Sequence, residues 1–240
     1  MNIDVQLIPL SIPLEMISKK IVVVVDVLRA TSVIAQAINQ GALEIVPVST
    51  VEEAFQKEKE FPPGTTLLGG EKDTRRIEGF DLGNSPREYI SEKIKGKRII
   101  LRTTNGTQAF HLVSAGKEVM VGSFLNLDAV AERCVKGEED LFIYPSGDEG
   151  LFSLEDTVCG GKLIDQVLKK KKQPIQLSDA SQAVHLLFKR FANDLVEAFR
   201  LSRHGQKLIR LGLEEDLTYC GQSDLLSVVP IFKEGVIRTG

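Results

Sequence analysis

The sequence predicts an α/β protein with a largely parallel or mixed sheet, flanking helices and a helical C-terminal portion. Short apolar runs, such as VVVV at 22–25, alternate with segments of helical periodicity as far as about residue 170. This alternation is typical of parallel sheets, whose central strands are apolar on both faces. From about residue 178, apolar residues recur at helical spacing. We expect residues 1–240 to form a single domain, a length that can bury a sizeable core.

A duplicated strand–helix–strand unit accounts for the layout of residues 21–55 and 96–130. A shift of 75 residues aligns VVVVDVLRATSVIAQAINQG with KRIILRTTNGTQAFHLVSAG. Each copy has a strand, a polar loop with threonine, a helix that ends at Gly41 or Gly116, and a second strand. Glycine suits these helix ends because it adopts the left-handed conformation easily. A third unit of strand, glycine-bearing loop and helix is expected over 140–170.

Capping patterns predict where further helices begin. The three capping boxes are Thr50 with Glu53, Ser85 with Glu88, and Ser153 with Asp156. One long amphipathic helix is expected from Ser178 or Asp179 to about residue 200, and another helix should close at Gly212. The glycine-punctuated segment 67–84 is expected to be a long irregular loop, and such loops are often functional.

Composition and charge exclude several classes of protein. The formal charge of −3 and the pI near 5.8 give no basic surface for nucleic acid, and KKKK at 169–172 suits a helix end. No apolar run approaches the ~20 residues of a membrane span, and the first residues lack a basic leader. We therefore expect a cytoplasmic protein with a small-molecule partner, without nucleic acid or membrane, and we allow for a homo-oligomer. The three cysteines include no CxxC pair, which argues against a disulfide framework or a zinc site.

Two polar loops, DVLRATS and RTTNGT, occupy equivalent positions in the two repeats. Both follow a strand, and open α/β sheets bind ligands at the carboxyl ends of their strands. Unpaired N–H groups and hydroxyls at the following helix starts would attract phosphate. The candidates for phosphate contacts are Arg29, Thr31, Ser32, Thr103, Thr104, Asn105, Gly106 and Thr107. The alternative is that the threonines and Asn105 are ordinary helix N-caps.

Isolated carboxylates beside turns favour a hard cation. These carboxylates are Asp26, Glu71, Asp81, Glu155 and Asp156. Mg²⁺ takes one or two carboxylates and completes its shell with water and substrate phosphate, whereas zinc prefers nitrogen or sulfur ligands. Only three histidines occur in the chain. Of these, His204, at a predicted helix start, is the candidate for the site.

Several familiar phosphate chemistries are excluded. The sequence has no P-loop pattern, no GxGxxG and no HExxH. Haloacid dehalogenase phosphatases also place an aspartate after a hydrophobic strand, but they need a second acid two residues later, where this chain has Leu28. The cysteine phosphatases are excluded because none of the three cysteines is followed six residues later by an arginine.

A set of ordered motifs identifies a known family. The segments DVLRATS, GGE, GFDLGNSP, TTNGT, GSFLN and FSLEDTVCGG occur in this order. Together they resemble the 2-phosphosulfolactate phosphatase family, from about Val22 to Pro230. The resemblance implies a Mg²⁺-dependent acid phosphatase that hydrolyses 2-phosphosulfolactate to sulfolactate and inorganic phosphate, a step on a route to coenzyme M. Two positions depart from the family pattern, Lys72 after GGE and Arg102 before TTNGT.

The resemblance also suggests roles for individual residues. The metal candidates are Asp26, Glu71 and Asp156, and the catalytic candidates are Asp26, Asp81 and Glu155, the last two to orient water. The substrate-binding candidates are Arg29, Thr31, Ser32, Asn84, Ser85, Arg102, Thr103, Thr104, Asn105, Gly106, Thr107, Ser123, Asn126 and His204. Three anionic groups on the substrate call for more than one arginine, and Arg75, Arg76 and Arg203 are further candidates.

Two competing hypotheses remain open from the sequence. One is a non-catalytic module in which the two threonine loops bind a phosphorylated anionic metabolite. The other is a general phosphatase in which Asp26 is a covalent nucleophile.

Overall fold

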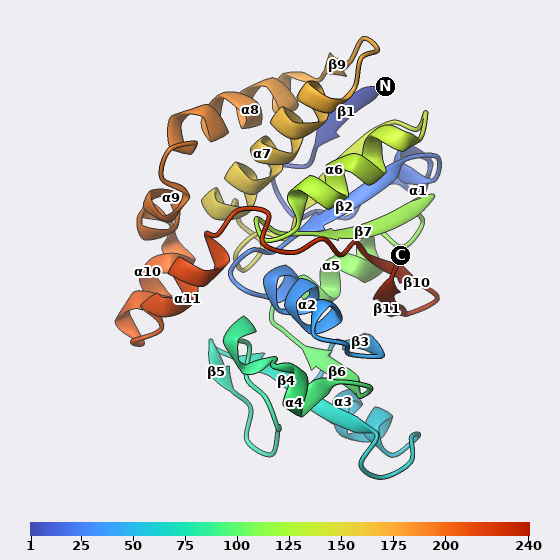
Figure 1. The fold of residues 1–240 in the computed structure, drawn as a ribbon, viewed down its shortest axis with the longest axis vertical. Helices are drawn as coiled ribbons and strands as arrows, with labels where there is room; N and C mark the ends of the chain where they lie inside the picture. Colours follow the sequence, from blue (N-terminus) through green and yellow to red (C-terminus); the bar gives the residue numbers. More distant parts are fainter.

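The computed structural model describes residues 1–240 and contains one mixed, largely parallel sheet of 11 strands flanked by helices (Figure 1). The predicted α/β class with helices in the C-terminal part is therefore confirmed. The strands are β1 Asn2–Val5, β2 Ile21–Val25, β3 Glu44–Val48, β4 Thr66–Lys72, β5 Arg75–Arg76, β6 Arg98–Arg102, β7 Glu118–Gly122, β8 Leu141–Pro145, β9 Gln176–Leu177, β10 Pro230–Lys233 and β11 Val236–Thr239.

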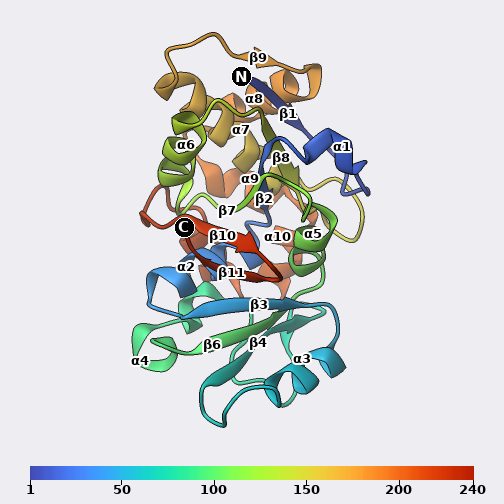
Figure 2. The same cartoon turned by 90° about the vertical axis from the view of Figure 1, so that its right-hand side faces the viewer.

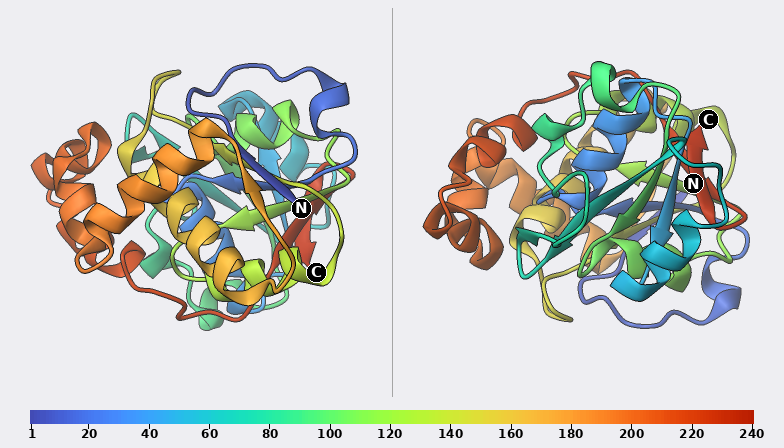
Figure 3. Two further views of the ribbon diagram at one scale, coloured as in Figure 1. Left: turned by 90° about the horizontal axis from the view of Figure 1, so that it is seen from above. Right: turned by 90° about the horizontal axis from the view of Figure 1, so that it is seen from below.

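Eleven α-helices and one 3₁₀ turn connect and cover these strands. They are α1 Leu14–Ile17, α2 Ala30–Asn39, α3 Val51–Glu58, α4 Ser91–Ile94, α5 Gly106–Leu112, α6 Leu127–Lys136, α7 Leu154–Lys170, α8 Asp179–Phe191, α9 Leu195–Leu201, α10 Arg203–Arg210, α11 Glu214–Cys220 and the 3₁₀ turn η1 Pro86–Glu88. Figure 3 shows α9, α10 and α11 grouped at one side of the molecule in both views. None of the helices is both long and apolar enough to cross a membrane.

The sheet consists of two parallel halves joined by an antiparallel hairpin. Its strand order is β5-β4-β6-β3-β11-β10-β7-β2-β8-β1-β9, and the C-terminal hairpin β10–β11 lies between β7 and β3. Figure 2 shows β3, β6 and β4 running across the view while β1 and β8 run steeply, because the sheet is strongly twisted. The twist turns the two halves toward each other, so loops from both can border one cavity.

The two segments aligned in the sequence form β2–α2–β3–α3 and β6–α5–β7–α6. The first strand of each segment pairs with the second strand of the other, β2 with β7 and β3 with β6, all parallel. Each segment therefore crosses from one half of the sheet to the other. This interlocking brings the loop after β2 close to the loop after β6, where Gly106 packs against Asp26.

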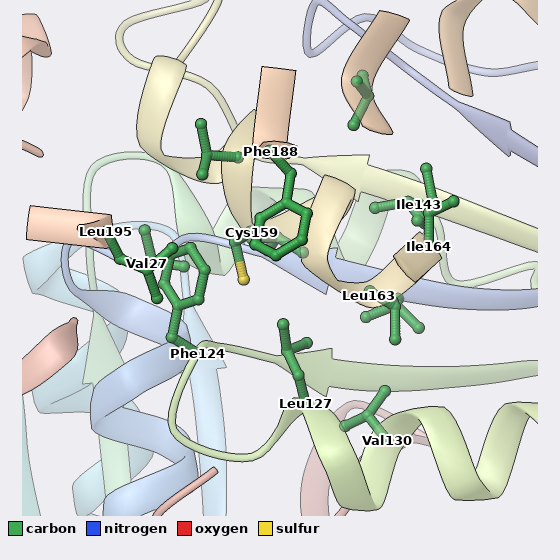
Figure 4. Close-up of a cluster of buried hydrophobic side chains, with 14 of the residues drawn as sticks. Val27, Phe124, Leu127, Val130, Ile143, Cys159, Leu163, Ile164, Phe188 and Leu195 are labelled. Carbon is green, nitrogen blue, oxygen red and sulfur yellow. The ribbon is translucent and has the colours of Figure 1, made fainter. Parts of the chain in front are cut away.

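The core lies on both faces of β2, whose five residues are all buried. On one face, its side chains join a cluster that includes α6, α7 and α8, in which Leu127, Cys159 and Leu163 lie together (Figure 4). On the other face, Val22 and Val24 join a second cluster that includes α2 and α5. A run of valines suits this place because β-branched side chains pack well on a pleated surface covered on both sides.

The capping boxes give two confirmations and one correction. Thr50 Oγ1 accepts from the N–H of Glu53 at 3.0 Å, and Ser153 Oγ accepts from the N–H of Asp156 at 3.3 Å, as predicted. Ser85 caps nothing: it precedes only the 3₁₀ turn, and no side-chain cap is made. The prediction was wrong because Ser85 donates its hydroxyl to a distant carboxylate instead.

Two helix predictions are also corrected. The expected long helix is broken into α8 and α9, because Asp194 starts a new helix by accepting from the N–H of Glu197 at 3.0 Å. Gly41 has the expected positive φ of 89°, whereas Gly116 does not. At Gly116 a Cβ would lie 2.7 Å from Val22 Cγ2, so close packing explains this glycine.

The segment expected to be a long irregular loop contains strand β4. Both glycines of this strand have close neighbours, and Gly70 also has a positive φ of 134°, which favours glycine. A Cβ on Gly69 would lie 2.4 Å from Tyr89 Oη, and one on Gly70 would lie 1.9 Å from the carbonyl oxygen of Arg102. Glycine inside a strand often marks such a close backbone approach. The strand delivers Glu71 to the same region as the two polar loops.

Candidate active site

A small polar cavity lies where the loops after β2, β6 and β8 meet the end of β4 and the start of α10. Only one of its lining residues, Leu28, is hydrophobic. The polar and charged lining residues are Asp26, Arg29, Glu71, Asp73, Thr74, Asn84, Thr103, Thr104, Asn105, Asp148, Glu149, His204 and Lys207. The cavity thus gathers eight of the residues predicted from sequence, and we call it the site cavity.

Asp26 is held at the end of β2 by its own loop. Its Oδ1 accepts from the N–H of Ala30 at 3.3 Å, and its N–H donates to Thr31 Oγ1 at 3.1 Å. A Cβ on Gly106 would lie 2.7 Å from Asp26 Oδ2, so only glycine lets α5 start this close. Burial raises the pKa of Asp26, and the nearby His204 partly offsets this shift. A buried carboxylate of this kind favours a positive ligand.

Arg29 spans the cavity wall and is fixed from two sides. Its NH1 donates to Asp216 Oδ2 at 2.6 Å and its NH2 donates to the carbonyl oxygen of Thr74 at 3.2 Å. Ser85 Oγ donates to the other Asp216 oxygen at 2.6 Å. The Nε of Arg29 is buried without a partner. Because buried donors are normally satisfied, this Nε is a natural contact for a bound anion.

Glu71 is positioned by the second threonine loop. Its Oε1 accepts from both the N–H and the hydroxyl of Thr104 at 2.8 Å, and its Oε2 accepts from the N–H of Thr74 at 2.7 Å. Arg102 NH1 donates to the carbonyl oxygen of Glu71 at 2.7 Å. Thr104 and Arg102 therefore hold Glu71 in place, although the Nε of Arg102 is buried without a partner.

His204 and Asp148 form an ion pair across the cavity, with 3.7 Å between Nδ1 and Oδ1. Arg203 Nε donates to Asp148 Oδ2 at 2.6 Å. The pKa of Asp148 is held well below its usual range by His204 and Arg203. Burial opposes the charge of His204, but Asp148, Glu155 and Asp26 outweigh it and raise the pKa of His204 above its ordinary value. The imidazole therefore favours its protonated form beside Asp26.

Two acids lie behind the cavity rather than in its wall. Asp156 and Glu155 begin α7 and are only 3% and 4% exposed. Asp156 Oδ1 accepts from the N–H of Val27 at 2.8 Å, which ties α7 to the loop after β2. The pKa of Asp156 is raised, mainly by burial and further by repulsion from Asp26 and Glu155. Burial also raises the pKa of Glu155. Asp26 therefore belongs to a buried acidic group, and His204 partly offsets the rise in the pKa of Asp26.

Several predicted residues make hydrogen bonds within their own loops or lie outside the site cavity. Ser32 Oγ donates to the carbonyl oxygen of Val27, and Thr103 and Thr107 cap each other at the start of α5. Ser123 and Asn126 bond to each other before α6, outside the cavity. Asp81 is exposed and accepts from the N–H of Leu68 at 2.8 Å, also outside the cavity. The N-cap residues of α2 and α5 are Arg29 and Asn105, and neither makes a side-chain cap, so the N-cap interpretation is not confirmed for Asn105.

Sequence reasoning missed the acids Asp148, Glu149 and Asp73, together with Thr74 and Lys207. Asp148 and Glu149 follow β8 as Asp26 follows β2, so the third repeat-like unit contained a usable signal. Lys207 lies one helical turn after Arg203 on α10, and no local pattern distinguished it from other surface lysines. Thr74 and Asp73 form the turn between β4 and β5, and both have positive φ, 72° and 53°.

The charge of the site cavity bears on which ligand it accepts. With all five of its carboxylates ionised, and with Arg29 and Lys207 positively charged, the lining has a net charge of −3. The net charge becomes −2 when His204 is protonated. No group of three or more His, Cys, Asp or Glu side chains is arranged to hold a metal ion by itself. Mg²⁺ needs only one or two carboxylates, because water and substrate phosphate complete its shell. The oxygen-only donors and the excess of negative charge fit such an ion.

Comparison with known proteins places this site in a family. A model of the 2-phosphosulpholactate phosphatase family matches residues 6–235, nearly the whole chain. The chain belongs to this family. A protein of Caldanaerobacter subterraneus subsp. tengcongensis, named as a probable 2-phosphosulfolactate phosphatase, is 43% identical over 93% of this chain and 92% of its own length. Proteins of the same name from Clostridium tetani and Clostridium perfringens are 40% and 41% identical, over 99% and 100% of this chain and 100% and 96% of their own lengths.

Family membership agrees with the polar cavity, because phosphatases of this kind act on small and highly charged molecules. It also makes the chain an enzyme, which removes the non-catalytic module as an explanation of the two threonine loops. The residues that border the site cavity come from six separate parts of the chain, as expected of an active site built on loops.

Proposed function

We propose that this protein hydrolyses 2-phosphosulfolactate to sulfolactate and inorganic phosphate with the help of Mg²⁺. The observation that supports this most directly is the site cavity, which is lined by a buried carboxylate, Asp26, together with Arg29 and His204. In a family of phosphatases, this combination supplies both a cation site and fixed contacts for a phosphate. The product would enter a sulfonate pathway of the coenzyme M type.

Asp26 is the residue proposed to hold Mg²⁺, with Glu71 or Asp156 as a second carboxylate. The support is the excess of negative charge around Asp26, which includes Glu71 and Asp156 among its neighbours. When bound, the ion would neutralise charge on the phosphate oxygens during transfer. Asp81, Glu155 and Asp156 do not border the cavity, and the water-orienting role of Asp81 or Glu155 stays a prediction.

Arg29 is proposed to bind and orient the phosphate. Asp216 and the carbonyl oxygen of Thr74 already fix the two terminal nitrogens of Arg29. Its unpartnered Nε can therefore contact a ligand without a further loss of side-chain conformational freedom. Asn105 can assist, since its Oδ1 accepts from the N–H of Glu149 at 3.2 Å and its amino group remains for the substrate. Preorganised donors of this kind are effective because they need not reorganise as the reaction proceeds.

His204 is proposed to protonate the alkoxide oxygen that leaves the phosphorus. Asp148 engages Nδ1, which leaves the other ring nitrogen for the substrate. The proton would pass from this nitrogen to the leaving oxygen as the P–O bond breaks, while a water supplies the new P–O bond. Arg203 keeps Asp148 ionised and in place.

The proposed function is tested by measuring phosphate release from purified protein with Mg²⁺. The substrate panel contains 2-phosphosulfolactate, phospholactate and p-nitrophenyl phosphate. We expect the highest kcat/KM with 2-phosphosulfolactate. Equal values for all three would indicate a general phosphatase, and no release from 2-phosphosulfolactate would contradict the proposal.

Replacement of His204 by Gln should reduce kcat by about a hundredfold, a common contribution of a general acid. The pKa of His204 is raised, so the wild-type enzyme should keep the active, protonated form above pH 6.5 and lose activity as pH rises through that higher pKa. The variant should lack this alkaline loss. The control is His185→Gln, because His185 pairs with Asp165 away from the cavity. An unchanged alkaline limb in His204→Gln would exclude the acid role.

A further inference from the structure

A second cavity lies beside the site cavity and is much larger. Its volume is about 350 Å³, compared with about 30 Å³ for the site cavity. The larger cavity, which we call the side cavity, is bordered by Arg75, Arg76, Ser85, Glu88, Leu211 and Leu213. Arg29, Thr74 and Asn84 border both cavities.

The lining of the side cavity carries net positive charge, with three arginines against one acid, Glu88. Arg75 and Arg76 make no ion pair and no side-chain hydrogen bond, although most charged groups nearby are paired, such as Arg87 with Glu215. Glu88 is the only acid in the lining, and its Oε2 already accepts from the N–H of Gly83 at 2.8 Å. The site cavity is net negative, so the two neighbouring cavities differ in sign.

The shared wall contains three buried polar atoms without partners. They are Arg29 Nε, Thr74 Oγ1 and Asn84 Oδ1. Buried polar groups are rarely left unsatisfied, because the lost hydrogen bonds to water are not replaced. Three such atoms on one wall are available to a polar molecule that spans the two cavities. The Asn84 carboxamide can face such a molecule with either its oxygen or its amino group.

The hairpin that presents the two arginines is tightly constrained. Asp73 and Thr74 form its two-residue turn with φ of 53° and 72°, and positive φ is unusual for a β-branched residue such as Thr74. Thr74 is held on both sides: its N–H donates to Glu71, and its carbonyl oxygen accepts from Arg29. Strained backbone persists only where its surroundings hold it, and here the residues that hold it belong to the site cavity. The position of Arg75 and Arg76 is therefore coupled to the site.

We propose that the side cavity binds the anionic groups of the substrate that are not transferred, its sulfonate and carboxylate, through Arg75 and Arg76. The phosphate then occupies the site cavity, and the carbon chain crosses the wall at Arg29, Thr74 and Asn84. A planar guanidinium binds a sulfonate or carboxylate through two parallel hydrogen bonds, which suits these groups. This inference rests on the proposed function for the identity of the substrate. It assigns substrate selection to the β4–β5 hairpin rather than to Arg102, whose guanidinium holds the backbone of Glu71.

The test compares the double variant Arg75→Gln/Arg76→Gln with the control Arg87→Gln, an exposed arginine that pairs with Glu215 and borders neither cavity. For each protein, kcat/KM is measured with 2-phosphosulfolactate and with phospholactate, which lacks the sulfonate. In the double variant, we expect the ratio of the two values to fall at least about tenfold, mainly through KM for 2-phosphosulfolactate. The control should keep the wild-type ratio. An unchanged ratio in the double variant would overturn the inference.

A binding measurement separates this inference from the proposed reaction. Sulfolactate, which has no phosphate, is titrated into wild-type protein and the double variant by calorimetry. We expect the wild-type protein to bind it and the Kd to rise at least about tenfold in the double variant. Equal binding by the two proteins would overturn the inference whether or not the wild-type enzyme hydrolyses 2-phosphosulfolactate. Absence of turnover together with this Kd difference would contradict the proposed reaction and retain the anion site.

Discussion

Removal of divalent cations should reduce phosphate release to background, and added Mg²⁺ should restore it. The site cavity carries a net charge of −2 or −3 and would repel a phosphorylated, sulfonated substrate. One Mg²⁺ would neutralise most of this charge and let the substrate approach Arg29. The measurement is phosphate release after thorough chelation, followed by titration with Mg²⁺. Full activity after chelation would contradict the proposed cation.

The same ion should also stabilise the fold. A ligand present at 100 times its Kd stabilises the native state by about 2.7 kcal/mol, so Mg²⁺ should raise the Tm of the substrate-free protein. This readout does not depend on catalysis. A Tm that is insensitive to Mg²⁺, together with activity that requires it, would place the ion with the substrate rather than on the protein's own carboxylates.

Replacement of Asp26 by Asn should reduce kcat by at least about a thousandfold, the upper range for loss of one preorganised group. The substitution is nearly isosteric and keeps an acceptor for the N–H of Ala30, so the fold should be retained. Burial raises the pKa of Asp26, which means that its charged form destabilises the folded protein above that pKa. Without Mg²⁺ and at neutral pH, the variant should therefore be at least as stable as wild type.

The control for this experiment is Asp128→Asn, which removes an equal charge from an exposed position on α6. The control should keep wild-type activity and the rise in Tm with Mg²⁺, whereas Asp26→Asn should lose both. The covalent alternative is examined separately, by rapid quench and mass analysis of wild-type enzyme with substrate. A phosphoryl group found on Asp26 would show that this side chain, rather than water, attacks the phosphorus.

Several features of the fold and site could be predicted from local sequence. The valine run of β2 predicted a buried strand, and its C-terminal Asp26 was expected at a ligand-binding edge. Thr50 and Ser153 were found as helix caps because a capping box is encoded within four residues. Glu71 was noticed because of the glycines beside it. These signals work because each depends on neighbours in the chain.

Other features depend on partners that are distant in sequence. Asp216 lies 187 residues from Arg29 and 131 residues from Ser85, yet one carboxylate binds both. Ser85 therefore failed as a predicted cap, because a long-range hydrogen bond replaced the local one. Asp148 was missed for a similar reason, since its importance comes from Arg203 and His204 on α10.

Local patterns in the chain were enough to predict the α/β class, most strands and helices, and the strand ends at which polar residues gather. The fold decides which of those residues share a cavity, because that depends on the interlocked pairing of β2 with β7 and β3 with β6 and on where α10 and α11 pack. It also decides which polar groups are free. Thr104 and one terminal nitrogen of Arg102 are bonded to Glu71, whereas Arg75 and Arg76 remain unpaired. Hydrogen bonds between distant residues leave no periodic trace in the chain.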